Sequence, residues 1–113
     1  MTAHEFRLMA LSLPEVTESV HMGHPDFRVK NRVFASLGYP ARGWGMVKLT
    51  PEQQDWLVGA APGAFSPVNG AWGLAGSTNI KLQAASKGMV REALITAWRN
   101  RAPKRLAQQV PHG

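Results

Sequence analysis

The sequence contains no cysteine, which excludes disulfide bonds, thiolate metal sites and a cysteine nucleophile. It also lacks any run that approaches the ~20 apolar residues needed to cross a bilayer, so we expect no membrane-spanning helix. The N-terminal stretch has no basic start, and Glu5 and Arg7 interrupt its apolar residues. This pattern is not typical of a signal peptide. We therefore expect a cytoplasmic protein with no membrane partner.

Acidic residues are also scarce: seven Asp and Glu face thirteen Lys and Arg, which gives a formal net charge of +6. The excess is concentrated in residues 26–48 and from residue 99 onward, and comprises Arg28, Lys30, Arg32, Arg42 and Lys48, then Arg99, Arg101, Lys104 and Arg105. Basic surface attracts polyanions and is typical of nucleic-acid binding. Many small proteins are nevertheless basic without a specific polyanionic partner, so charge alone leaves both interpretations open.

A chain of 113 residues fits a single domain. We place that domain at residues 1–103 and interpret residues 104–113 as a basic C-terminal tail that frays. Pro103 marks the boundary, since a proline cannot continue the helix expected before it. Hydrophobic residues make up 44% of the chain, which is enough for one hydrophobic core in a domain of this size.

Three segments carry helix signals. Residues 2–12 begin with Thr2 and Glu5 at capping-box spacing, and residues 50–59 begin with the similar pair Thr50 and Gln53. The third helix is expected at residues 86–101, where apolar residues recur every three or four positions. They predict a core-facing stripe of Val90, Ala93, Leu94, Ala97 and Trp98. Trp56, in the second helix, is also expected to pack inside the protein.

Strand-like stretches occupy residues 17–22, 26–29, 32–37, 44–49, 65–68 and 79–83. Lys30 and Asn31 fit a two-residue hairpin turn, because asparagine tolerates a left-handed backbone. Alternation at period two then separates two faces, with Phe27, Val29, Val33, Ala35 and Leu37 on one and Arg28, Arg32, Phe34 and Ser36 on the other. The order of elements predicts an α+β sandwich, in which a mainly antiparallel sheet is flanked by an N-terminal and a C-terminal helix.

Residues 21–28 read HMGHPDFR and place His21, His24, Asp26 and Arg28 close together in sequence. A zinc site normally needs three or four protein ligands, and the other histidines lie near the chain ends. Histidine suits general-base chemistry near neutral pH, but the sequence marks no partner for it. We therefore assign no metal, no cofactor and no catalytic residue. These side chains are expected to make turn hydrogen bonds or to line a surface cleft.

Two glycine-rich stretches, GWG at residues 43–45 and GAWGLAG at residues 70–76, match neither the phosphate-loop nor the dinucleotide-binding pattern. We interpret their glycines as sites of turns or close backbone approach. Their tryptophans, Trp44 and Trp72, are expected on or near loops, and Tyr39 at a loop tip. A basic surface with exposed aromatic rings can hold phosphates and stack on bases. The alternative is that the tryptophans fill the core of a small domain.

Several longer stretches resemble one known family: ALSLPEVTES (10–19), HMGHPDFRVKNRVFASL (21–37), GWGMVKLTPEQQ (43–54), FSPVNGAWGLAGSTNIKL (65–82) and AWRNRAPKRL (97–106). In amino-acid sequence, order and spacing, these stretches are similar to the MmcQ/YjbR-like family. The resemblance implies a compact α+β fold similar to that of CyaY/frataxin and a DNA-binding role with a double-wing arrangement. Iron binding does not carry over, because in frataxin it relies on an acidic helix edge, and the first helix here has only Glu5.

We therefore expect a protein that binds nucleic acid, most simply DNA, weakly or without sequence preference. Basic residues are expected to contact phosphates and tryptophans to contact bases or a groove: Arg28, Lys30, Arg32, Arg42 and Lys48 in the first group, Trp44 and Trp72 in the second. The main alternative is a small-ligand or enzymatic pocket lined by His21, His24, Asp26, Arg28 and Trp72. A protein-interaction module that uses the same face is the third. The sequence leaves the oligomeric state open.

Overall fold

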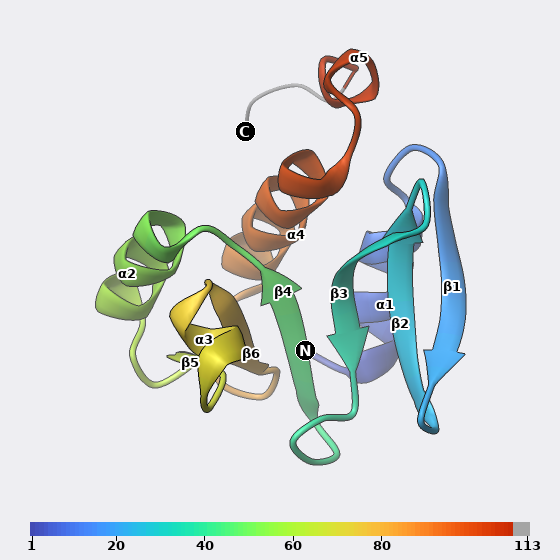
Figure 1. Cartoon of the computed structure of the whole chain (residues 1–113). Helices are drawn as coiled ribbons and strands as arrows, with labels where there is room; N and C mark the ends of the chain where they lie inside the picture. Colours follow the sequence, from blue (N-terminus) through green and yellow to red (C-terminus); the bar gives the residue numbers. More distant parts are fainter. Residues whose placement is uncertain (110–113) are drawn as a thin grey trace.

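The computed structural model describes residues 1–109. Its centre is a six-stranded sheet in the order β1-β2-β3-β4-β6-β5 (Figure 1). The strands are β1 (Val16–His21), β2 (His24–Val29), β3 (Arg32–Leu37), β4 (Trp44–Lys48), β5 (Phe65–Pro67) and β6 (Ser77–Lys81). Every neighbouring pair is antiparallel. The predicted α+β class with a mainly antiparallel sheet is therefore confirmed.

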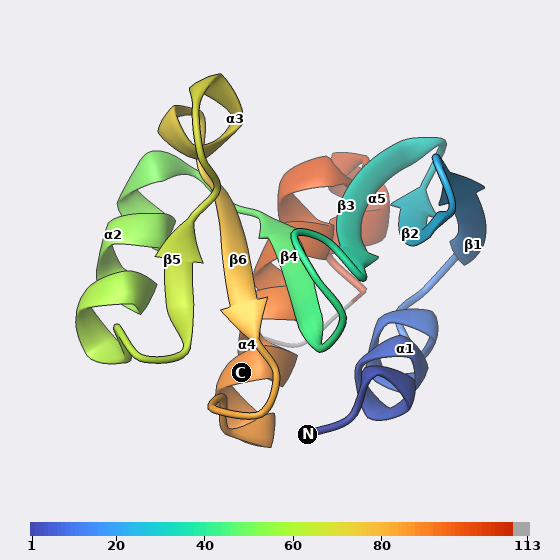
Figure 2. The same ribbon diagram turned by 90° about the horizontal axis from the view of Figure 1, so that it is seen from below.

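Five helices are present within the described residues: α1 (Ala3–Leu11), α2 (Pro51–Ala60), α3 (Ala71–Leu74), α4 (Lys87–Arg101) and α5 (Lys104–Ala107). Figure 2 shows α1 and α4 on one side of the sheet, α2 beside its β5 edge and the short α3 on the other side. One face of the sheet is thus covered by long helices and the opposite face is not. No helix among residues 1–109 is long and apolar enough to span a bilayer.

Local capping signals set where the first two helices begin. The Thr2 hydroxyl accepts the Glu5 backbone N–H, and the Glu5 carboxylate accepts the Thr2 N–H. Thr50 and Gln53 form the same reciprocal pair at the start of α2. Both predicted capping boxes are confirmed, because each depends only on side chains three residues apart.

The hydrophobic core lies between the sheet and the pair α1 and α4. The predicted stripe on α4 is confirmed: Val90, Ala93, Leu94, Ala97 and Trp98 are all buried. Trp98 has no exposed surface, and its indole N–H donates to the Pro14 carbonyl at 3.0 Å. This hydrogen bond joins α4 to the segment that connects α1 to β1.

Phe34 corrects the predicted alternation of the β2–β3 hairpin. We expected it on the face that carries Arg28 and Arg32, but it is fully buried in the core. The register explains the difference, since Phe27 pairs with Ala35 while Arg28 pairs with Val33, so a β-bulge leaves Phe34 between two pairs. A bulge inserts one residue into one strand and re-aims a side chain. Simple period-two counting therefore places Phe34 on the wrong face. The same register also reverses two other predicted positions, because Val33 is the partner of Arg28 and Arg32 is the partner of Val29.

Trp56 is a second correction. We expected its ring inside the protein, but 72% of it is exposed on α2. The helix instead turns Leu57 and Gln54 inward, and the Gln54 amide donates to the backbone carbonyls of Gly73 and Ser77. Gln54 is therefore buried with its hydrogen bonds satisfied, at the inward-facing position of α2 that hydrophobicity alone would give to Trp56.

Several segment boundaries also differ from those predicted. β2 begins at His24 and contains Pro25, which is tolerated because the pairing of β2 with β3 begins only at Asp26. β6 begins at Ser77, before the expected residue 79, and the short helix α3 lies in the glycine-rich stretch that precedes it. The expected fraying tail begins with α5, whose Leu106 is buried. The last part of that tail, residues 110–113, lies outside the described residues.

Candidate nucleic-acid interface

The strand register shows which side chains occupy the face of the sheet that the long helices leave uncovered. Phe27, Ala35 and Val47 are buried toward the helices. The alternate positions point away from the core and form a row across all six strands, each residue the partner of the next: Ser19, Asp26, Ser36, Met46, Asn79 and Ser66. We call the side of the sheet that carries this row the open face.

The paired strands β4 and β6, which we call the β4–β6 ladder, have a tryptophan and a lysine beside each other at each end of the ladder, on the open face. Trp44 and Lys81 are direct cross-strand partners at one end. At the other end Lys48 is the partner of Ser77, and its Nζ lies 4.2 Å from the centre of the Trp72 ring. The pair between these ends, Met46 and Asn79, is uncharged.

Lys48 is held in place by several neighbours. Its Nζ donates to the Ser77 hydroxyl at 3.1 Å, and its side chain is half-buried beneath the Trp72 ring. Burial lowers the pKa of Lys48, and the charge of Arg101 lowers it further. No carboxylate among residues 1–109 forms an ion pair with Lys48. A bound anion would offset both effects, because an opposite charge favours the protonated ammonium.

Glycines in GAWGLAG position Trp72 by allowing close backbone approach. A Cβ atom on Gly73 would lie 1.6 Å from the Val68 carbonyl oxygen, and one on Gly76 would lie 1.9 Å from the Leu49 oxygen. Gly76 also has φ +117, a conformation that L side chains rarely adopt. The close-approach interpretation of this stretch is therefore confirmed, and it fixes α3 at the end of β4 and the start of β6.

Two of the five basic residues predicted to contact phosphate are paired with carboxylates. The Arg28 guanidinium donates to both oxygens of Asp26, at 2.9 and 3.1 Å, and this interaction raises the pKa of Arg28. The Lys30 Nζ lies 2.6 Å from a carboxylate oxygen of Glu15, near the start of β1. Both cations are therefore less available to a polyanion than their sequence positions suggest.

Arg32, Lys48 and Arg101 meet at one corner of the sheet, where β3 begins and β4 ends; we call this set the cationic corner. Arg32 Nη1 lies 3.5 Å from the Arg101 carbonyl oxygen, and Arg101 Nε donates to the Val33 carbonyl at 3.0 Å. None of the three has a carboxylate ion pair within residues 1–109. Sequence reasoning did not select Arg101 as a contact residue, because its place beside Lys48 depends on how α4 packs on β3 and β4.

Arg42 lies apart from the cationic corner. It is exposed in the loop before β4, whereas Lys48 ends that strand (Figure 1). Trp44, at the start of β4, is half-buried rather than fully exposed. The predicted phosphate contacts therefore do not form one patch: Arg32 and Lys48 share the cationic corner, Arg28 and Lys30 are ion-paired, and Arg42 is at the far end of β4.

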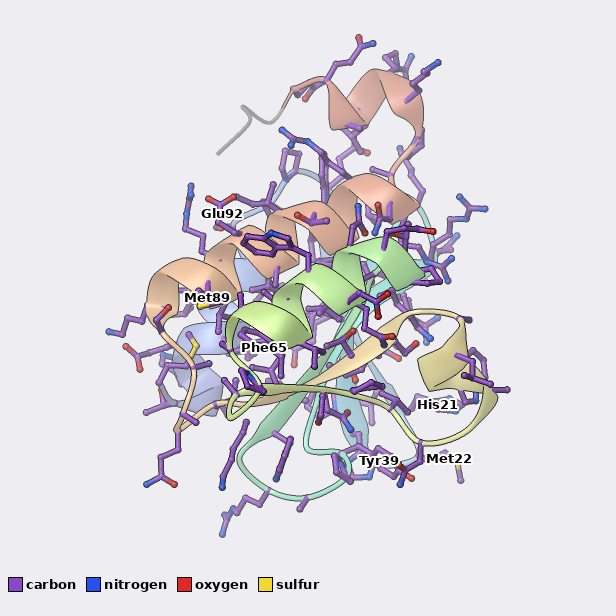
Figure 3. The ribbon with its side chains drawn as sticks, turned by 90° about the vertical axis from the view of Figure 1, so that its left-hand side faces the viewer. His21, Met22, Tyr39, Phe65, Met89 and Glu92 are labelled. Carbon is purple, nitrogen blue, oxygen red and sulfur yellow. The ribbon has the colours of Figure 1, made fainter. Side chains whose placement is uncertain are left out.

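The two histidines of HMGH face each other as cross-strand partners beside the β1–β2 turn. The His24 ring meets the Tyr39 ring edge-on with centroids 6.0 Å apart. Figure 3 shows His21, Met22 and Tyr39 near one another on one side of the molecule, away from Glu92 and Met89. Within the part of the chain that the structure describes, no three His, Asp or Glu side chains are placed to hold a metal ion.

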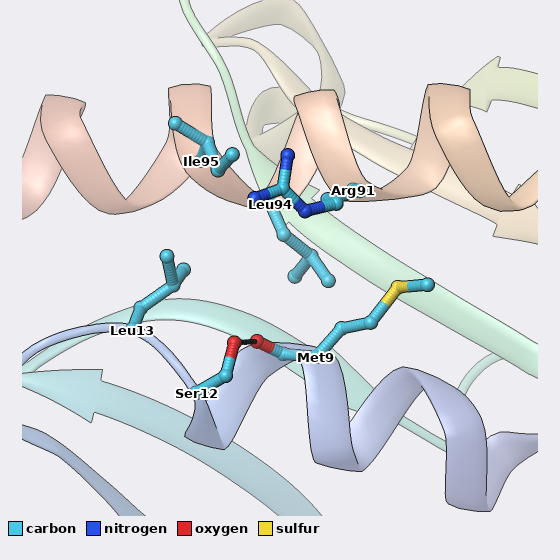
Figure 4. Close-up of a pocket in the computed structure, with 6 residues that line it drawn as sticks. All are labelled: Met9, Ser12, Leu13, Arg91, Leu94 and Ile95. Atoms are coloured by element: carbon cyan, nitrogen blue, oxygen red, sulfur yellow. Dashed lines mark hydrogen bonds between the residues drawn. The ribbon is translucent and has the colours of Figure 1, made fainter. Parts of the chain in front are cut away.

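The residues of the alternative ligand pocket divide between two parts of the open face. His21, His24, Asp26 and Arg28 lie on β1 and β2, whereas Trp72 contacts Lys48 on β4, with β3 between. Two hollows lie on the helical side instead. One hollow of about 30 Å³ lies between α1 and α4 (Figure 4), and another of about 190 Å³ lies between α2 and α4. None of the five proposed pocket residues lines either hollow.

Comparison with known proteins identifies the fold and the family. No protein of curated function matches the chain. The crystal structure of the Deinococcus radiodurans protein DR2400, of domain family DUF419, is similar with a TM-score of 0.71 at 19% sequence identity, over 88% of this chain and 77% of that one. At this identity the likeness concerns the fold alone. The YjbR family model matches residues 11–100, from the end of α1 almost to the end of α4. The chain therefore belongs to the YjbR family.

Proposed function

We propose that this protein binds nucleic acid through phosphate contacts at the cationic corner and the adjoining open face. The observation that carries the proposal is the environment of Lys48: a half-buried ammonium beside Arg101, without a carboxylate partner among residues 1–109. Like charges that lie close together and partly out of water disfavour each other. A phosphate that sits between them replaces this repulsion with attraction.

Binding of this kind carries little sequence information. Phosphate contacts fix the position of a protein on nucleic acid but do not distinguish bases. The affinity should therefore be modest, similar for different sequences, and strongly dependent on salt, because each neutralised phosphate releases condensed counterions. The formal charge of +6 assists the approach of a polyanion but does not itself define where it binds.

The test is a salt series of fluorescence anisotropy titrations with a labelled DNA duplex of mixed sequence. Replacing Lys48 by glutamine should weaken binding and reduce the slope of log affinity against log salt by about 0.9, the value for one lost phosphate contact. The matched control is Arg91→Gln, which removes the same charge from an exposed position on α4, beside Glu92 and outside the cationic corner. It should change the slope much less.

Ion-paired cations provide a second comparison. Lys30→Ala should alter the slope less than Lys48→Gln, because Lys30 is already paired with Glu15. The proposal would be overturned if neither duplex nor single-stranded DNA bound at low salt, or if the Lys48→Gln variant bound with the wild-type affinity and slope. Equal effects of Lys48→Gln and Arg91→Gln would show that only net charge matters, and would remove the cationic corner as the site.

A further inference from the structure

The open face combines extended backbone, aromatic rings and cations along the β4–β6 ladder. Lys48 and Trp72 stand at one end, Trp44 and Lys81 at the other. Trp44 and Lys48 are four residue steps apart along an extended strand, which corresponds to ~13 Å at ~3.3 Å per residue. This length suits a short segment of an extended polynucleotide, with a cation and an indole ring at either end.

We infer that the preferred ligand is single-stranded nucleic acid, laid along the β4–β6 ladder with bases stacked on Trp72 and Trp44. The inference rests on the proposed function and narrows its ligand class. Trp72 is 67% exposed, so the ring surface that Lys48 does not cover is open to a base. Stacking on aromatic side chains needs an exposed base face, which a single strand offers and a duplex interior does not.

The width of the open face argues against base contacts with a duplex. Six strands at ~4.8 Å spacing span ~24 Å, whereas the major groove is about 12 Å wide and admits a helix or a two-stranded ribbon. A duplex therefore meets this sheet only through its backbone. A single strand can lie flat across the sheet and use both the cations and the tryptophans, as sheet-based readers of single strands do.

Asn79 provides an uncommitted polar group between the two tryptophan–lysine ends. Its Oδ1 is buried without a hydrogen-bond partner among the described residues, and its side chain is half-buried at the centre of the ladder. Buried polar atoms are usually hydrogen-bonded, so one without a partner calls for an explanation. Rotation of the amide toward the open face would let it bond the edge of a base that is stacked nearby.

The experiment compares labelled oligo-dT with a blunt duplex of the same length at one low salt concentration. Oligo-dT should bind at least about tenfold more tightly, since each stacked base adds affinity that a duplex cannot supply. Oligo-U, measured in parallel, tells whether a ribose or a deoxyribose backbone is preferred, and tight binding of either single strand supports the inference. Duplex binding that equals or exceeds single-strand binding would overturn it while leaving the proposed function intact.

Two tryptophan variants distinguish the loss of base stacking on Trp72 from the effect of removing any exposed indole ring. Trp72→Ala should weaken oligo-dT binding by about 5- to 150-fold, the range for one lost stacking contact, with little change in duplex affinity or in the salt slope. The control Trp56→Ala removes an equally exposed indole from α2 and should leave both affinities unchanged. If Trp72→Ala weakens duplex and single strand equally, base stacking is refuted. If neither nucleic acid binds at low salt, the proposed function fails as well.

Discussion

Replacement of Trp98 by alanine tests the core of this fold most directly. Trp98 is the largest of the fully buried side chains, and large-to-small changes of buried aromatic residues cost about 3–5 kcal/mol. Its indole N–H also donates to the Pro14 carbonyl, a hydrogen bond with a typical net contribution of about 0.5–1.5 kcal/mol. Domains of this size are stable by about 5–15 kcal/mol. Trp98→Ala should therefore remove a large fraction of the total stability.

The assay is urea unfolding followed by far-UV circular dichroism, because three other tryptophans complicate fluorescence. Trp98→Phe keeps most of the ring volume but loses the N–H group, so its loss should be intermediate, about 1–3 kcal/mol. Trp56→Ala, at an exposed position, should change the free energy of unfolding by less than about 0.5 kcal/mol. A loss below about 1 kcal/mol for Trp98→Ala would refute the packing described for α4.

Three further predictions follow from particular contacts. The Lys87 ammonium and the Thr2 backbone N–H lower the pKa of Glu5 from 4.5 to about 2, so the stability that this carboxylate contributes should be present above about pH 4.5 and lost as the pH falls toward 2. Glu5→Gln should flatten that pH dependence in thermal melts, whereas Glu52→Gln should not. Gly76→Ala should prevent stable folding, as judged by circular dichroism, because its Cβ would overlap the Leu49 carbonyl. Lys48→Met should weaken DNA binding without lowering the melting temperature, since the fold already disfavours that charge.

Short-range signals in the sequence predicted the fold well. Capping pairs three residues apart located α1 and α2, and the apolar stripe of α4 identified Trp98 as a core residue. The Lys30–Asn31 turn was also predicted correctly, since both residues have positive φ. Each of these features depends on side chains within one helical turn or one hairpin, which is the range over which a sequence pattern constrains the backbone.

Features that depend on register or packing were not predictable in this way. The bulge that buries Phe34 leaves no mark in a period-two pattern, and Gln54 rather than Trp56 faces inward because its amide finds backbone partners on α3 and β6. The ion pair between Lys30 and Glu15 joins the β2–β3 turn to the start of β1. No local sequence pattern indicates this pair, because Glu15 and Lys30 are far apart in the sequence.

The cationic corner shows why charge pairing, and not charge count, locates the proposed interface. Five of the seven acids form ion pairs within residues 1–109, and their partners are Arg7, Arg28, Lys30, Lys87 and Arg91. Those pairs offset one cation on α1, Arg28 and Lys30 in the β2–β3 hairpin, and two cations on α4. Lys48 and Lys81, at the two ends of the β4–β6 ladder, have no such partner there, and neither does Arg101. A cation without a carboxylate partner therefore lies at each end of this ladder, Lys81 beside Trp44 and Lys48 beside Trp72, which is the arrangement a stacked, negatively charged strand requires.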